Sequence, residues 1–280
     1  MILNSKNIFD AHTHIHFPAY DQDRDEVIRR AQAAGVKMIT VGTNLQTSKE
    51  AIAIAEKYPE DIWATVGIHP TEIRNSSFES RNFRTLAERS KVVAIGECGL
   101  DYFRISNDEF RIKEEQKKVF LEQVEIAKDL KKPLMIHCRP SKGADDAYED
   151  LLKALSPQDL MVLRRQIVMH FFVSSLSIAK KLLEADCYFT FGGVITFVRD
   201  YDEVIKYLPL ENILLETDAP YVTPEPHRSQ VGLGRGKRNE PAYVVEVAKK
   251  IAEIKNVSLE EVIKQTTGNS KTIFKINTPH

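Results

Sequence analysis

Short apolar runs alternate with amphipathic stretches along the whole chain, and this alternation predicts the fold. Each run is a nearly continuous series of Val, Ile, Leu and similar residues, as expected for strands that are covered on both faces. The eight predicted strands are Asn7–Ala11, Lys37–Gly42, Ile62–Gly67, Val92–Glu97, Pro133–His137, Ile167–His170, Cys187–Phe191 and Ile213–Thr217.

The stretches between the runs have the spacing of helices. Asp25–Ala34 carries its apolar residues on one face and is followed by Gly35, a favoured residue after a helix end. Glu114–Lys131 repeats this pattern. The tail is predicted to add helices over Ala242–Ile254, Ser258–Gln265 and Ser270–Lys275.

Eight strands joined by helical connections predict an α/β fold, a (β/α)8 TIM barrel. We expect residues 1–280 to form a single domain, because about 250 residues is typical of such a barrel. A doubly wound open sheet is the main alternative. The rim chemistry described below favours a closed barrel.

Charge, hydropathy and cysteine content indicate which partners and which compartment the protein can have. The net charge is −1, so any contact with a polyanion must rely on a local basic patch. No apolar run approaches the ~18–20 residues that cross a bilayer, and the chain does not begin with a signal-peptide pattern. Cys98, Cys138 and Cys187 lack metal or redox spacing and predict buried, reduced thiols. We therefore expect a cytoplasmic protein with no membrane partner.

Side chains that can bind metals stand at the carboxyl ends of five predicted strands. They are His12, His14, Glu97, His137, His170 and Asp218. Residues so far apart in sequence converge when parallel strands share one rim, where TIM barrels have their active sites. In addition, positions i and i+2 of a strand point to the same side, so His12 and His14 can face one ion.

The six residues together indicate a metal site more strongly than any one of them does. A single His on an apolar strand is usually a core residue, and Glu97 alone would be compatible with a salt bridge. Together, four imidazoles and two carboxylates exceed the three protein ligands of a typical catalytic zinc. They suit two divalent ions about 3.5–4 Å apart, an arrangement used for displacement at phosphorus. The ligand types are compatible with Zn, Mg, Mn, Fe, Co or Ni.

Seven ordered motifs carry a resemblance that spans nearly the whole chain. They are Asp10-Ala11-His12-Thr13-His14, Gly67-Ile68-His69-Pro70, Gly96-Glu97-Cys98-Gly99-Leu100-Asp101, His137-Cys138-Arg139, Gly193-Val194-Ile195-Thr196-Phe197, Glu216-Thr217-Asp218-Ala219-Pro220 and Arg238-Asn239-Glu240-Pro241. The chain resembles the TatD family of metal-dependent deoxyribonucleases, a branch of the amidohydrolase-like TIM barrels. It departs from that family after His170, where Phe171-Phe172-Val173-Ser174 replaces a small residue or Cys followed by Phe-Ser-Gly.

The resemblance implies a site. By resemblance, one metal is held by His12, His14, Glu97 and Asp218, and the other by Glu97, His137 and His170. His69 lies near the scissile phosphate in that picture. The implied catalytic residues are Asp218, Glu97 and His69, with Asp218 able to take a proton from water.

The implied reaction is hydrolysis of DNA phosphodiester bonds by a 3′→5′ exonuclease, on single-stranded DNA or frayed ends. One alternative uses the same ions to hydrolyse an ester or amide, such as D-aminoacyl-tRNA. A second alternative is a degenerate barrel that binds or scaffolds, which the complete ligand set disfavours. A monomer is compatible with the sequence.

Candidate substrate-binding residues are basic or aromatic. Arg139 follows a metal ligand and is predicted to clamp a phosphate, with a surface salt bridge as the alternative. The long segment Ala219–Glu240 is predicted to cover the substrate, or else to be an irregular connection. It holds four cations, Arg228, Arg235, Lys237 and Arg238. Tyr102-Phe103-Arg104 is predicted to stack a base, unless its rings pack in the core.

Overall fold

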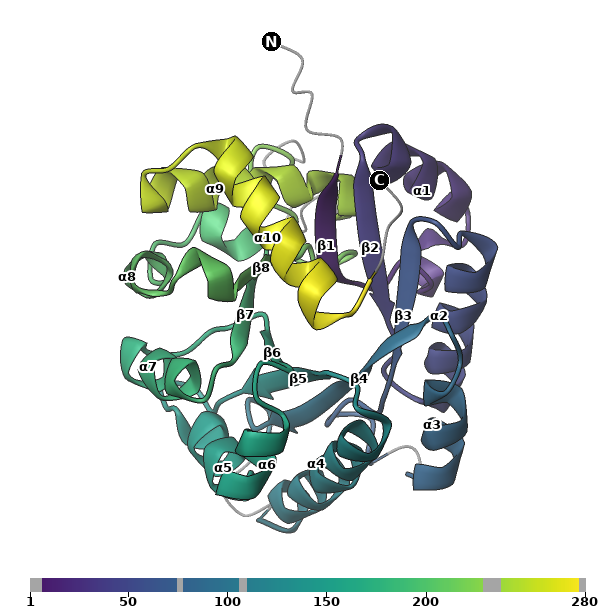
Figure 1. Cartoon of the computed structure of the whole chain (residues 1–280), viewed down its shortest axis with the longest axis vertical. Coiled ribbons are helices and arrows are strands. Elements are labelled where there is room, and N and C mark those ends of the chain that lie inside the picture. Colours follow the sequence, from purple (N-terminus) through teal and green to yellow (C-terminus); the bar gives the residue numbers. More distant parts are fainter. Residues whose placement is uncertain (1–6, 75–77, 106–109, 229–237, 277–280) are drawn as a thin grey trace.

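Eight parallel strands form a barrel with the helices outside (Figure 1). The computed structural model describes residues 7–74, 78–105, 110–228 and 238–276. Its strands are β1 Ile8–Thr13, β2 Val36–Val41, β3 Ile62–Val66, β4 Val92–Asp101, β5 Leu134–Arg139, β6 Ile167–His170, β7 Tyr188–Phe191 and β8 Ile213–Leu215. The strands are ordered β1 to β8, and Thr13 of β1 forms a parallel bridge with Ala219 beyond β8. The predicted TIM barrel is therefore confirmed, and the open sheet is excluded.

The helices follow the strands around the barrel. The α-helices are α1 Arg24–Ala33, α2 Leu45–Lys57, α3 Ser80–Ala87, α4 Phe110–Leu130, α5 Asp146–Ala154, α6 Pro157–Val162, α7 Leu176–Glu184, α8 Asp202–Tyr207, α9 Val244–Lys255 and α10 Leu259–Ile273. Short 3-10 helices span Pro18–Tyr20, Gly193–Thr196, Leu210–Asn212 and Pro241–Tyr243.

The tail differs from its prediction. The two helices predicted over Ser258–Gln265 and Ser270–Lys275 are one continuous helix, α10. Thr266, Thr267 and Asn269, which lie between the two predicted helices, are buried and have hydrogen-bond partners. Ser270 Oγ donates to the carbonyl of Thr266. Asn269 Nδ2 donates to the carbonyls of Leu210, in the 3-10 helix before β8, and of Ile213, the first residue of β8. A buried polar side chain that is satisfied in this way does not end a helix.

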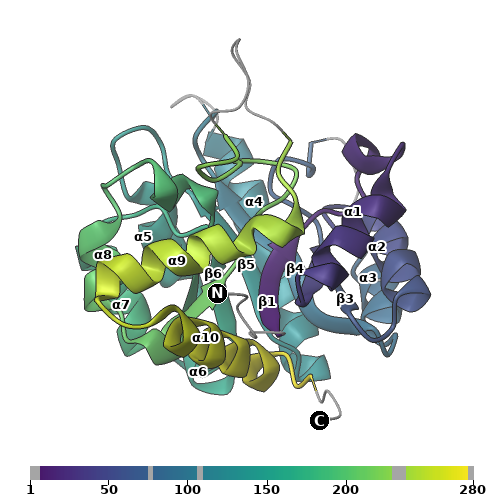
Figure 2. The ribbon, with the colours of Figure 1, turned by 90° about the horizontal axis from the view of Figure 1, so that it is seen from above.

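One end of the barrel is closed by the end of α10. Ile273, Phe274 and Ile276 pack with inward-facing strand residues such as Phe9 and Met135. Figure 1 shows α10 lying across this end. Figure 2 shows the same helix at one end of the barrel, away from the loops that follow the strands. The buried apolar end leaves the opposite end, at the carboxyl ends of the strands, for chemistry.

Two neighbouring strands are longer than predicted. β4 extends to Asp101 and β5 to Arg139, and these two residues pair with each other in register. The two strands therefore rise beyond Glu97 and His137 and form a wall on one side of the rim.

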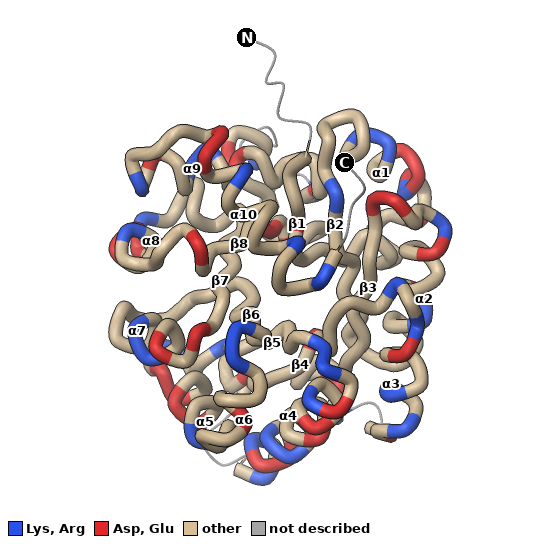
Figure 3. Tube along the Cα trace, viewed as in Figure 1, with Lys and Arg blue, Asp and Glu red and all other residues tan. Residues whose placement is uncertain are grey.

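Charged residues lie mainly on the outer helices, with both signs interspersed (Figure 3). Among the described residues, no helix combines the length and apolar character needed to cross a membrane. All three cysteines are buried and unpaired, as predicted.

Candidate metal centre

A cavity of about 1180 Å³ opens at the carboxyl ends of the strands. Of the six predicted metal ligands, five line it: His14, Glu97, His137, His170 and Asp218. The sixth, His12, is fully buried, and its Nε2 lies 3.2 Å from Nε2 of His14. The structure thus brings all six predicted residues together.

Glu97 is placed by an irregularity in β4. Between the pairs Ile95–Leu134 and Cys98–Ile136, β4 uses one residue more than β5 does. Such a bulge redirects a side chain, here the carboxylate of Glu97, into the cavity. Gly99 permits the close approach of the two strands, because a Cβ atom there would lie 2.0 Å from the carbonyl oxygen of His137.

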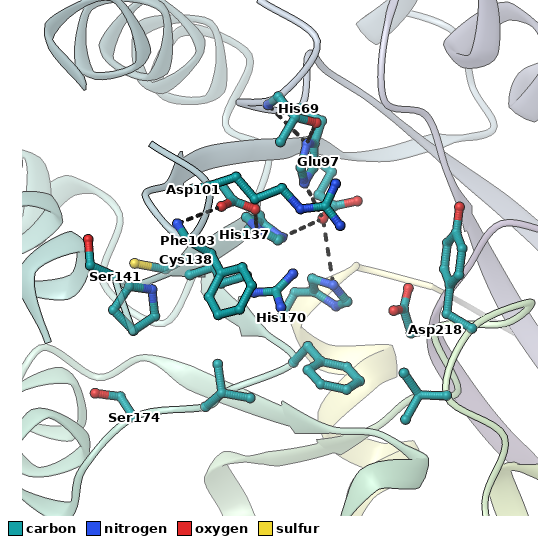
Figure 4. A pocket seen from close by; sticks show the side chains of 18 of the residues that line it. His69, Glu97, Asp101, Phe103, His137, Cys138, Ser141, His170, Ser174 and Asp218 are labelled. Carbon is teal, nitrogen blue, oxygen red and sulfur yellow. Dashed lines mark hydrogen bonds and ion pairs between the residues drawn. The ribbon is translucent and has the colours of Figure 1, made fainter. Parts of the chain in front are cut away.

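The two oxygens of Glu97 face different groups of histidines. Oε2 lies 3.4 Å from His12 Nε2 and 3.7 Å from His14 Nε2. Oε1 faces three other imidazoles, at 3.0 Å from His137 Nδ1, 3.4 Å from His69 Nε2 and 3.6 Å from His170 Nε2. Figure 4 shows this second group around Glu97. One carboxylate between two groups of nitrogens is the arrangement expected of a bridging ligand.

Asp218 belongs to the first group. Its Oδ1 lies 3.5 Å from His14 Nε2 and 3.8 Å from His12 Nε2. Its backbone N–H donates to the carbonyl of His12 at 2.9 Å, which fixes the end of β8 against β1.

Hydrogen bonds determine which nitrogen each histidine offers. His14 Nδ1 lies 2.7 Å from the carbonyl oxygen of Val41, which can only accept. His170 Nδ1 lies 2.8 Å from the carboxylate of Glu216. In both rings Nδ1 therefore carries a hydrogen, which leaves Nε2, on the side of Glu97, as the nitrogen that a metal ion can use.

His137 is oriented the other way around. Its Nε2 lies 3.1 Å from Asp101 Oδ2, and its Nδ1 faces Glu97. Burial lowers the pKa of His137, but hydrogen bonds to Asp101 and Glu97 outweigh this effect and raise it. A metal ion on the Glu97 side would replace the proton on Nδ1.

His69 differs from the predicted ligands. The backbone N–H of Thr71 donates to His69 Nδ1 at 3.2 Å, so Nδ1 is an acceptor and the hydrogen is on Nε2. Burial and the neighbouring His137 lower the pKa of His69 to about 3. His69 is therefore neutral near pH 7 and presents an N–H donor to the cavity.

The donor set fits metal ions. Nε2 of His12 and Nε2 of His14 lie 3.2 Å from each other and 3.4 and 3.7 Å from Glu97 Oε2, and a cation among these three atoms would stabilise the cluster. His12 Nδ1 is buried without a hydrogen-bond partner. Burial raises the pKa of Glu97, but His69, His12 and His170 lower it well below its usual value, so the bridging carboxylate is ionised. For Asp218, burial is likewise outweighed, by His14, His170 and His12, and its pKa is lowered.

Two orienting carboxylates had no predicted role. Asp101 holds His137, and Glu216 holds His170 while accepting a bond from Thr190 Oγ1. For Asp101 a signal existed, because alternation along an extended strand puts Glu97 and Asp101 on one side. Burial lowers the pKa of His170, but Glu216 and Glu97 raise it to about 9. Such partners of metal-binding histidines fix ring orientation and ligand basicity.

The predicted substrate-binding arginines lie in different places. Arg139 lines the cavity and stacks over the ring of Phe103. Arg235 and Lys237 lie outside the described residues. Arg228 stacks on Phe197, with 4.2 Å between its guanidinium carbon and the ring centre. Of the long segment, Tyr221 and Val222 line the cavity.

Arg238 forms an ion pair with Asp23. Nη1 donates to Asp23 Oδ1 at 2.8 Å and Nη2 to Oδ2 at 2.5 Å, and the guanidinium lies over the ring of Tyr20. The residues that line the cavity do not include Arg238. In this position the side chain joins the segment after β8 to the one after β1.

Arg238→Ala is therefore expected to reduce stability rather than catalysis. We expect the free energy of unfolding to fall by about 1 kcal/mol, since the pair is bidentate but partly exposed. Urea unfolding measures this loss, with Arg199→Ala, which removes an exposed pair with Asp202, as the control. Unchanged stability together with weaker substrate binding would instead support the predicted role of Arg238 in binding.

Comparison with known proteins identifies the family of the chain. A model of the TatD related DNase family matches residues 9–275. The uncharacterized metal-dependent hydrolase YabD of Bacillus subtilis is 37% identical over 274 residues, covering 96% of this chain and 100% of that protein. The 3′-5′ ssDNA/RNA exonuclease TatD of Salmonella typhimurium is 33% identical, covering 96% and 99%. The crystal structure of YJJV, a TatD homolog from Escherichia coli K12, superposes with a TM-score of 0.81 at 29% identity, covering 96% and 98%. The chain therefore belongs to the TatD related DNase family.

Proposed function

We propose that the protein is a metal-dependent phosphodiesterase that shortens single-stranded DNA from the 3′ end, as a 3′→5′ exonuclease. The observation that carries this proposal is the position of Glu97, whose two oxygens face separate groups of imidazoles. Support also comes from the relative named a 3′-5′ ssDNA/RNA exonuclease.

Two divalent ions would be held by the residues around Glu97. His12, His14 and Asp218 would hold one with Glu97 Oε2, and His137 and His170 the other with Oε1. When bound, such ions polarise the phosphate and lower the pKa of water toward about 7. Zn, Mg, Mn, Fe, Co and Ni are all compatible with these ligands.

The chain's own residues would complete the reaction. Asp218, ionised because its pKa is lowered, would accept the proton of the attacking water. His69 would donate its Nε2 hydrogen to a phosphoryl oxygen as negative charge develops there. Arg139 would bind a phosphate through its in-plane N–H groups.

The test uses single-stranded DNA labelled at either end, incubated with Mg²⁺ or Mn²⁺ and with a chelator. We expect stepwise shortening of the 5′-labelled strand and early release of a labelled mononucleotide from the 3′-labelled strand, both abolished by the chelator. No cleavage in any metal, together with hydrolysis of a D-aminoacyl-tRNA ester, would overturn the nuclease proposal in favour of a deacylase.

A further inference from the structure

We infer that Phe103 and Arg139 together form a stacking site for an unpaired nucleobase beside the metal centre. The inference rests on the proposed nuclease function and specifies how the substrate is held. Proteins hold unpaired bases on aromatic rings and on guanidinium planes, with little dependence on sequence.

The pair stands on the wall formed by the extended ends of β4 and β5. The backbone N–H of Tyr102 donates to the carbonyl of Arg139 at 2.8 Å, which continues the strand pairing. Phe103 N–H donates to Asp101 Oδ1 at 3.0 Å, and Asp101 Oδ2 bonds to His137. Hydrogen bonds therefore connect the backbone of Phe103 to a predicted metal ligand without interruption.

Phe103 is exposed where its neighbour is not. Tyr102 is fully buried and donates its hydroxyl hydrogen to Asp150, whereas Phe103 keeps 44% of its surface exposed. The exposed ring lines the cavity. In Figure 4, Phe103 lies with Asp101 and His137 on one side of Glu97, and Asp218 lies on the other. An exposed ring whose backbone is anchored by a hydrogen bond, and which contributes little to the core, offers its area to a ligand.

Arg139 adds charge to this flat surface. Its guanidinium carbon lies 3.8 Å from the centre of the Phe103 ring. Within the described part of the chain, no ion pair is formed by Arg139, nor by Arg104 or Lys142, which line the same cavity. A guanidinium stacked on a ring keeps its N–H donors free at its edge. The wall therefore offers a surface to a base and unneutralised charge to the adjoining phosphate.

This combination suits a nucleotide next to the one being cleaved. A base would stack on the free face of the ring or on the outer face of the guanidinium. The phosphate that joins it to the cleaved nucleotide would lie toward the three basic side chains. The Phe103 ring has no part in the reaction itself, so stacking on it should govern affinity more than turnover.

The experiment is an abasic scan of an oligonucleotide. Binding of fluorescent single-stranded thymidine oligonucleotides, each with one abasic position near the 3′ end, is measured by anisotropy in an Asp218→Asn background that keeps the strand intact. In this background, the protein with native Phe103 is compared with the variants Phe103→Ala and Phe103→Trp. Phe110→Ala is the control variant, since Phe110 is 68% exposed and does not line the cavity. In parallel, cleavage of the intact strand by the wild-type protein is measured with Mn²⁺.

We expect an abasic residue at one position to weaken binding roughly tenfold when Phe103 is present, a typical effect for one stacked base. The same lesion should have less than about a twofold effect in Phe103→Ala, whereas Phe110→Ala should behave as the parent does. Phe103→Trp should restore the position dependence, with quenching of the new indole on binding. The native Trp63, which packs with the residues that close the other end of the barrel, provides a constant background.

Two other results are decisive in different ways. In the first, the wild-type protein cleaves the intact strand, but binding depends on the abasic position in the same way with Phe103 and with Phe103→Ala. This result would overturn the stacking site and leave the nuclease function intact. A wild-type protein that neither binds nor cleaves the intact strand would overturn both.

Discussion

Glu97→Gln is expected to abolish the binding of both ions and to reduce cleavage of single-stranded DNA by at least about a thousandfold. The amide keeps the shape of the side chain but removes the charge that faces His12 and His14 through one oxygen and His137 through the other. Metal ions in such sites contribute several kcal/mol of transition-state stabilisation, and each 1.36 kcal/mol is about tenfold in rate.

Metal content by mass spectrometry and steady-state cleavage measure the two losses together. Glu72→Gln is the matched control, because Glu72 lines the same cavity and its carboxylate accepts a hydrogen bond from Asn44 Nδ2. A Glu97→Gln protein that retains two ions per chain would contradict the bridging role, whatever its activity.

Asp218→Asn is expected to lower kcat by about 10²- to 10⁴-fold, the range for loss of a positioned acid or base. Burial raises the pKa of Asp218, but His14, His170 and His12 lower it below the ordinary value, so the native side chain is ionised near pH 7. The amide cannot accept a proton there. The ion beside His137 should remain bound, because Asp218 lies with the other group.

The measurement is steady-state cleavage with metal content determined on the same samples. Asp200→Asn provides the comparison, since Asp200 lines the cavity but is exposed and separate from the histidine cluster. An unchanged kcat in Asp218→Asn would remove Asp218 from the reaction and leave it, at most, a ligand.

Much of this architecture could be predicted from the sequence because apolar runs and strand-end polar residues are local patterns. The run Ile167–His170 is a strand with the predicted bounds. The ends of β4 and β5 could not be predicted, because the pairing of Asp101 with Arg139 depends on two segments meeting in space. The single helix α10 was missed because burial of Asn269 satisfies its amide through tertiary contacts.

For the site, residue types were predictable and their orientation was not. The convergence of His12, His14 and Glu97 follows from strand ends on a common rim. Which nitrogen of His69 carries a hydrogen depends on a backbone N–H of Thr71, and only coordinates reveal it. The position of Arg238 beside Asp23 likewise depends on a contact between segments 215 residues apart.

The meeting of β1 with β8 has a consequence for folding. All consecutive strands from β1 to β8 are joined by regular pairing. β1 and β8, in contrast, meet through the isolated Thr13–Ala219 bridge and a few hydrogen bonds. This junction is where the barrel closes, and the residues that would hold one ion lie on both sides of it, with His12 and His14 on one side and Asp218 on the other. An ion held there would link the first strand to the end of the last one. Metal binding and closure of the barrel would therefore favour each other. Catalytic readiness and completion of the fold would then be a single event, reached only when both ends of the chain have arrived.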